Sequence, residues 1–137
     1  MLGVVNMTTT RTMVISGVAV LAMMVVRGAE KPAAKFTELQ RRAILGTGLE
    51  GVTTVAEIPP GATSARHSHP GEDFGYLIEG TIVLQVDGKP PVTVRAGEVF
   101  FTERGQIHNA RNIGTTTARA VDTYVIDKGK SGITPAP

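Results

Sequence analysis

The chain has 137 residues, the size of one folded domain, and carries 14 basic residues, 12 acidic residues and no cysteine. The lack of cysteine excludes a disulfide framework and a thiol nucleophile. Two of the basic residues lie in the first 29 positions, so the rest of the chain is formally neutral and we expect no nucleic-acid partner.

Residues 1–29 are predicted to be a signal peptide. Arg11 precedes an apolar run of 14 residues, Met13 to Val26, and the small residues Gly28 and Ala29 follow; this order is typical of secretory signals. The run is shorter than the roughly 20 residues that span a bilayer. We therefore expect an exported protein, secreted or periplasmic, without stable membrane association after cleavage. A retained N-terminal membrane anchor is the alternative.

Residues 30–50 are interpreted as a linker and an N-terminal arm. The segment from Glu30 to Lys35 is polar and contains Pro32. The next segment, Phe36 to Leu45, fits either one or two helical turns or an extended arm. Its apolar pattern is too short to decide between them.

Residues 51–128 have the pattern of a compact all-β domain, because short runs rich in Val, Ile and Thr alternate with Gly and Pro. The pairs Glu79-Gly80 and Asp87-Gly88 are hairpin signals. About eight short strands favour two packed or closed sheets, as in a jelly roll. Residues 129–137 lack an apolar period and are expected to be a flexible tail. The expected strands are Val52–Ile58, Ala65–His69, Phe74–Ile78, Thr81–Val86, Val92–Arg95, Val99–Thr102, His108–Asn112 and Arg119–Ile126.

All three histidines of the chain fall in positions that suit a metal site. Residues two apart project from the same face of a strand, so His67 and His69 point together. His108, from another strand, would complete a facial set. Imidazole with one carboxylate suits Fe, Mn, Ni, Cu or Zn, and we expect one such divalent metal. Either Glu72 or Asp73 could supply the carboxylate.

Two segments, HSHPGEDFGYLIEG (67–80) and AGEVFFTERGQIHNARN (96–112), resemble the two motifs of the cupin superfamily, in particular its small single-domain members. The resemblance covers roughly residues 50–128 and implies a double-stranded β-helix, or jelly-roll barrel. It also implies that His67, His69 and His108 are metal ligands and that Asp73 is the carboxylate ligand, with Glu72 as the alternative.

The chain departs from the cupin pattern at two positions. Asp73 stands where the family most often has glutamate, so its carboxylate is one methylene shorter and a water could replace it at the metal. Glu103 stands where the family often has proline, so we expect a looser turn before His108 with unchanged topology.

Three interpretations of the function fit these residues. The resemblance implies quercetin-dioxygenase-like chemistry, among other metal-dependent reactions, on a small organic molecule. The alternative is a non-catalytic module that binds a metal or small ligand with the same residues. A metal-free structural barrel is the third interpretation. The resemblance also implies a homodimer, in which the arm Phe36 to Leu45 could exchange between subunits.

Overall fold

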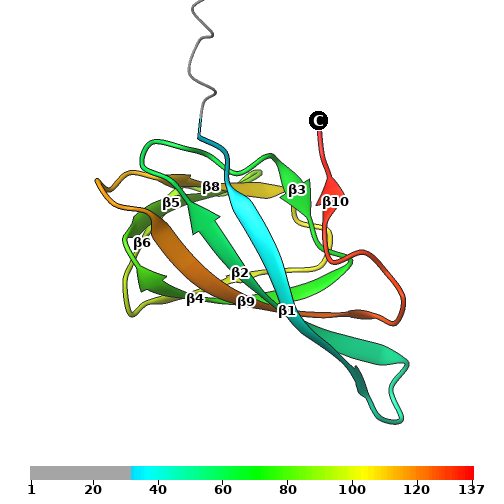
Figure 1. The fold of residues 1–137 in the computed structure, drawn as a ribbon. Helices are drawn as coiled ribbons and strands as arrows, with labels where there is room; N and C mark the ends of the chain where they lie inside the picture. Colours follow the sequence, from blue (N-terminus) through cyan, green and yellow to red (C-terminus); the bar gives the residue numbers. More distant parts are fainter. Residues whose placement is uncertain (1–31) are drawn as a thin grey trace, which may run out of the picture.

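The computed structural model describes residues 32–137, and the predicted signal peptide of residues 1–29 lies outside this part of the chain. The described residues form two five-stranded sheets that face each other across the core (Figure 1). No helix in this part of the chain is long and apolar enough to cross a bilayer. The strands are β1 (Lys35–Ile44), β2 (Leu49–Ile58), β3 (His67–Ser68), β4 (Gly71–Glu79), β5 (Thr81–Val86), β6 (Val92–Arg95), β7 (Val99–Thr102), β8 (His108–Asn112), β9 (Ala118–Asp127) and β10 (Thr134–Pro135).

The first sheet has the order β1-β2-β9-β4-β7, and neighbouring strands are antiparallel. Its centre is the pair β2 and β9, which runs in register from Leu49 opposite Asp127 to Ile58 opposite Ala118. In both strands every second residue is buried. This alternation turns one face of the sheet toward the core, as the Val, Ile and Thr pattern predicts.

The second sheet has the order β10-β3-β8-β5-β6 and covers the buried face of the first. Ile82 and Leu84 of β5 pack against Ile58 of β2 and Leu77 of β4 in the main apolar cluster. The result is a jelly-roll barrel, which confirms the predicted all-β class.

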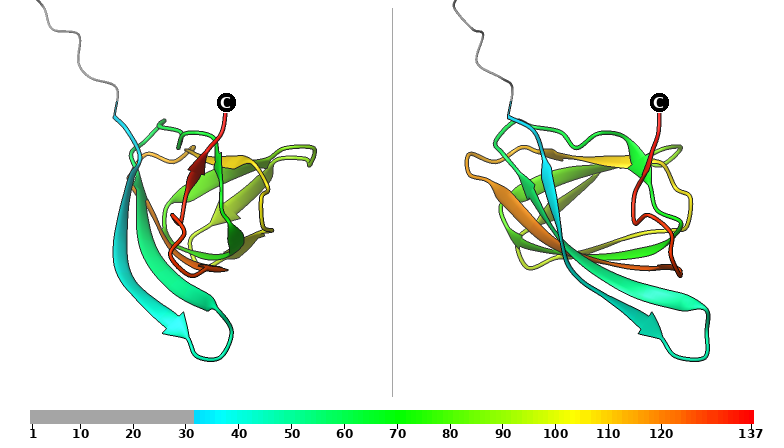
Figure 2. Two further views of the ribbon diagram at one scale, coloured as in Figure 1. Left: turned by 90° about the vertical axis from the view of Figure 1, so that its right-hand side faces the viewer. Right: turned by 45° about the vertical axis from the view of Figure 1, so that its right-hand side comes forward.

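The segment that the sequence left undecided is extended. Strand β1 pairs with β2 of the same chain along its whole length, and a tight turn that contains Gly46 and Gly48 joins them. Both glycines have positive φ, 77° and 70°, a conformation that suits glycine. Nearly all side chains of β1 are exposed or half-buried because it is an edge strand, and Figure 2 shows the β1–β2 hairpin extending beyond the barrel. This exposure explains why no apolar alternation marked the strand.

The predicted hairpin turns occur where the sequence places them. Gly80 joins β4 to β5 with a φ of 87°, and a Cβ there would lie 2.9 Å from the Cα of Ala118. Gly88 follows β5 with a φ of 74°. Both positions therefore need a residue that adopts a positive φ without strain, as glycine does. At Gly80 there is also no room for a Cβ atom.

The C-terminal segment, which was expected to be a flexible tail, contains the short strand β10. It folds back along β3, where Thr134 pairs with Ser68 and Pro135 with His67, and Figure 1 shows β10 beside β3. The amide of Ala136 donates a hydrogen bond to the carbonyl of Arg66 at 3.0 Å. Backbone pairing holds this segment without an apolar pattern, which is why composition did not reveal it.

Candidate metal centre

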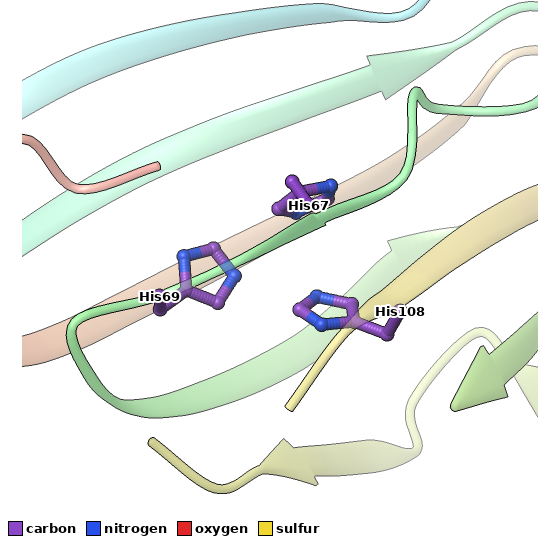
Figure 3. Close-up of side chains that lie close together, drawn as sticks. All are labelled: His67, His69 and His108. Atoms are coloured by element: carbon purple, nitrogen blue, oxygen red, sulfur yellow. The ribbon is translucent and has the colours of Figure 1, made fainter. Parts of the chain in front are cut away.

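The three histidines converge on one point inside the barrel (Figure 3). His67 of β3 lies directly opposite His108 of β8, and His69 follows β3 on the same side. The ring centroids of His67 and His108 are 4.4 Å apart, and the centroid of His69 lies 5.0 Å from each. One ligand atom from each ring lies within 4.8 Å of the others. Two ligands on opposite sides of one metal are separated by roughly 4 Å, so the three rings could share an ion.

Each imidazole is held by a hydrogen bond to a backbone carbonyl. The acceptors are Ala65 for His67 at 2.7 Å, Gly132 for His69 at 2.7 Å and Gln106 for His108 at 2.9 Å, with Nδ1 as the ring atom in every case. A carbonyl oxygen only accepts, so each Nδ1 carries the proton. The opposite nitrogen, Nε2, is then a lone-pair donor, which is the arrangement of metal-ligating histidines.

Burial favours the neutral form of His69 and His108. Burial lowers the pKa of His69 to about 4, and the nearby His108 and His67 lower it further. The hydrogen bond to the carbonyl of Gly132 acts in the opposite direction and raises it. The pKa of His108 is also lowered, mainly by burial. At neutral pH both rings therefore have a free nitrogen lone pair without first losing a proton.

Asp73 lies in the same cavity but beside only one histidine. Its Oδ2 is 3.7 Å from Nε2 of His69 and accepts a hydrogen bond from Oγ1 of Thr102 at 3.4 Å. Its Oδ1 is buried and has no partner among residues 32–137. Burial, followed by the charge of Asp122, raises the pKa of Asp73 to about 8. The structure thus groups the three histidines, with the Asp73 carboxyl next to them rather than within the group.

Glu72, the alternative carboxylate, belongs to the other face of β4. Asp73 is buried whereas Glu72 is only half-buried, as strand alternation requires. Asp73 lines the cavity of the histidines, and Glu72 does not. The geometry therefore favours Asp73 over Glu72.

Two further cavity residues, both on β9, were not among the predicted site residues. The ring of Tyr124 stacks on that of His69 at a centroid distance of 4.2 Å, and its hydroxyl accepts a hydrogen bond from Thr54. Asp122 is 5% exposed, and burial raises its pKa to about 7. The alternation of β9 puts both on its buried face, but the outward valines at positions 121 and 125 obscure this alternation in the sequence.

The cavity between the sheets is small and mostly apolar. Its volume is about 40 Å³, and one water needs roughly 10–15 Å³ by the same measure. Apolar side chains such as Ile82, Leu84 and Phe100 surround the polar end, and no arginine or lysine of the described chain lines it. The space suits a metal ion with a few waters or a ligand of few atoms.

The turn before His108, which was expected to be looser without proline, is closed by two hydrogen bonds. The amide of Glu103 donates to Oε1 of Gln106 at 3.1 Å, and the amide of Gln106 donates to the carbonyl of Glu103 at 3.0 Å. A proline at position 103 would lack the first of these donors. Glu103 thus replaces a fixed φ with a hydrogen bond, and the carbonyl of Gln106 stays in place to orient His108.

A jelly-roll barrel that gathers three imidazoles inside one small cavity defines a class of proteins able to hold a metal between two sheets. Residues 54–124 match the Cupin domain family, so the resemblance seen in the two motifs is confirmed and the chain belongs to that family.

Three curated relatives illustrate the range of the family. The chain is 38% identical to the tetracenomycin polyketide synthase protein TcmJ of Streptomyces glaucescens, over 58% of this chain and 56% of that protein. It is 38% identical to an oxalate-binding protein of Thermotoga maritima, over 44% and 50%. It is 31% identical to oxalate oxidase GF-2.8 of Triticum aestivum, over 64% and 43%. The chain thus spans about half the length of these relatives.

Solved structures support the same architecture. Oxalate oxidase in complex with the substrate analogue glycolate superposes with a TM-score of 0.63 at 27% identity, over 80% of this chain and 58% of that one. A double-stranded β-helix protein of Klebsiella pneumoniae gives a TM-score of 0.64 at 22% identity, over 79% and 88%. The second likeness concerns the fold alone.

Proposed function

We propose that this cupin binds one divalent transition metal through Nε2 of His67, His69 and His108, and uses the metal to hold a small organic acid. The observation that carries the proposal is the grouping of the three rings, each held at Nδ1 by a backbone carbonyl and each with one ligand atom within 4.8 Å of those of the others. Fe, Mn, Ni, Cu and Zn all suit such a donor set.

Asp73 is proposed as the carboxylate that completes the site. Its unpartnered Oδ1 is a buried acceptor that a cation would satisfy, and its Oδ2 already lies beside His69. A metal held in this way would supply a Lewis acid or redox centre. The chain itself supplies the rigid rings, the stacked Tyr124 and the apolar walls that exclude bulk water.

A short acid is the ligand that the cavity favours, because about 40 Å³ leaves little room for a large phenol. The oxalate-binding and oxalate oxidase relatives support this choice. Turnover of the acid with O2 is the enzymatic form of the proposal, and binding without turnover is the alternative form. The oxidase relative supports the first and the binding protein supports the second.

Metal content is the measurement that tests the proposal. The protein is reconstituted anaerobically with Fe(II), Mn(II), Ni(II) or Zn(II), beside the variants His108→Ala and Glu72→Gln. We expect about one metal per chain in the wild type and in Glu72→Gln, and loss of the metal in His108→Ala. Equal metal content in all three proteins, or none in any, would contradict the proposal. Oxygen consumption with small acids then separates the enzyme from the binding module.

Export and dimerisation remain part of the proposed function. Export rests on the signal-like residues 1–29. A dimer is supported by exposed apolar side chains on β4 and β7, among them Phe74, Val99 and Phe101. Light scattering checks the oligomeric state, and a monomer at working concentration would end the dimer proposal. Cell fractionation checks the export.

A further inference from the structure

Asp122 is a buried acid in the cavity wall that the proposed metal site does not use. It lies at the centre of β9, opposite Thr54 on one neighbouring strand and Gly75 on the other. Its side chain lines the cavity of the three histidines, and the residue is 5% exposed. Within residues 32–137 no hydrogen bond or ion pair reaches its carboxyl oxygens, and burial is the one cause of its raised pKa.

A buried carboxyl group needs a hydrogen-bond donor. Leaving such an acceptor without a partner costs about 1–3 kcal/mol, and most buried polar groups are therefore satisfied. The nearby threonine hydroxyls are already engaged, because Thr54 donates to Tyr124 and Thr102 donates to Asp73. A molecule inside the cavity is then the natural source of the donor for Asp122.

The charges of the cavity restrict what that molecule can be. Asp73 and Asp122 both line it, whereas no lysine or arginine of the described residues does. A bound metal would be the only positive charge. A dicarboxylate would bring a second negative charge into this cavity, where no lysine or arginine of the described residues could pair with it, and burying an unpaired charge is costly.

A short 2-hydroxy acid suits the part of the cavity that Asp122 lines. Its single carboxylate matches the metal, and its hydroxyl group is a donor for a carboxyl oxygen. The small volume of the cavity, about 40 Å³, restricts the ligand to very few carbon atoms.

We propose that Asp122 is a specificity-determining residue, which makes the site prefer a short hydroxy acid to a dicarboxylate by accepting a hydrogen bond from the ligand. The inference rests on the proposed metal site and names the ligand class of that site.

Calorimetric titration of the Mn(II)-loaded full-length protein with glycolate and with oxalate tests this preference, after metal analysis has shown that the ion is bound and retained. We expect the wild type to bind glycolate at least about tenfold more tightly than oxalate. In Asp122→Asn the oxalate affinity should rise about tenfold, because the asparagine amide can donate a hydrogen bond to the second carboxylate of the ligand. In Asp122→Ala the glycolate affinity should fall about tenfold, because the acceptor is lost.

Asp127→Asn is the matched control, since it makes the same chemical change on β9 at an exposed position. It should leave both affinities unchanged. Tighter binding of oxalate by the wild type, an unaltered preference in both Asp122 variants, or no glycolate binding to the loaded protein would each overturn the inference. Failure of the metal to bind at the loading step would instead overturn the proposed function. Asp122→Ala removes a buried unpaired carboxyl group, so it keeps the test available if the asparagine variant does not fold.

Discussion

The carboxyl group of Asp73 lies 3.7 Å from Nε2 of His69 and outside the group formed by the three histidines. One added methylene would extend its reach toward that group. We expect Asp73→Glu to bind the metal about tenfold more tightly than the wild type, and Asp73→Asn to bind it about tenfold more weakly. Competition with a chelator of known affinity measures both constants.

Glu72→Gln is the control for these variants, because Glu72 belongs to the opposite face of the same strand. Its metal affinity should equal that of the wild type. If Asp73→Asn also bound metal as well as the wild type, the carboxylate would have no place in the site, and three imidazoles with water would remain.

The two buried acids predict how the metal-free protein responds to pH. Their folded-state pKa values, about 8 for Asp73 and about 7 for Asp122, lie above the ordinary value of 3.8. As the pH rises, the unfolded chain therefore loses these protons before the folded protein does. The free energy of unfolding decreases until the pH reaches about 8. His69 has the opposite effect, since its pKa is lowered to about 4, but that effect acts only below its ordinary value of 6.5.

Between pH 6.5 and 8 these two acids determine how stability changes with pH. The free energy of unfolding should therefore fall as the pH increases. The slope for one proton is at most about 1.4 kcal/mol per pH unit. Urea denaturation of the metal-free protein at several pH values measures this slope, and Asp122→Asn should flatten it. A wild-type slope of zero in this window would show that the acids are not protonated in the folded state.

The sequence predicted the histidines of the site but not its second acid. His67 and His69 share a face by strand geometry alone, and His108 was placed by the second motif. On β9 the buried residues include Ala118, Ala120 and Asp122, while the outward positions include Val121 and Val125. Because an acid interrupts the inward set at position 122 and valines occur in the outward set, the alternation was not clear enough to show which side faced the core.

At the scale of elements, β10 and the turn before it hold His69, one of the proposed ligands, in place. The carbonyl of Gly132 accepts the Nδ1 proton of His69, and a Cβ at this glycine would lie 3.1 Å from the ring of Tyr124. Removal of residues 131–137 should lower the metal affinity by about 10- to 100-fold, as loss of such outer partners does. Removal of residues 134–137 alone keeps Gly132 and should cost less.

The chelator competition described for Asp73 also measures these truncations, and thermal unfolding of the metal-free forms separates a lost orientation from a lost fold. If both truncated proteins kept the wild-type affinity, the carbonyl of Gly132 would not determine the position of His69.

A strand could be predicted from the sequence only where one of its faces is buried. Most strands from β2 to β9 follow Val, Ile and Thr patterns between turn residues, whereas β3 and β8 carry the histidine motifs, and the predicted strands occur with shifts of a few residues at the ends. Strands β1 and β10 lie at the edges of the two sheets, where most side chains are exposed. Their backbone pairing leaves no apolar period in the sequence, so they could not be predicted from it.

At the scale of the molecule, the proposed site joins the two sheets. The histidines belong to the β3 and β8 side of the barrel, whereas Asp73 belongs to β4 of the other sheet. A metal at 1,000 times its dissociation constant stabilises the folded state by about 4 kcal/mol. We expect a chelator to lower the melting temperature by more than about 10 °C. His108→Ala should melt at one temperature with and without the chelator, and an equal shift in that variant would place the stabilising ion elsewhere.

The pairing of His67 with His108 has a consequence for the order of folding. His67 and His69 are only two residues apart in the chain, so on the proposed site they would be able to bind an ion together before His108 reaches them. His108 reaches them only when β8 meets β3 across a loop of roughly 40 residues. An ion already bound to the first two histidines would stabilise the closed loop as soon as His108 joins them. Refolding in the presence of metal should therefore form the β3–β8 contact ahead of the hairpins that lie between the two strands.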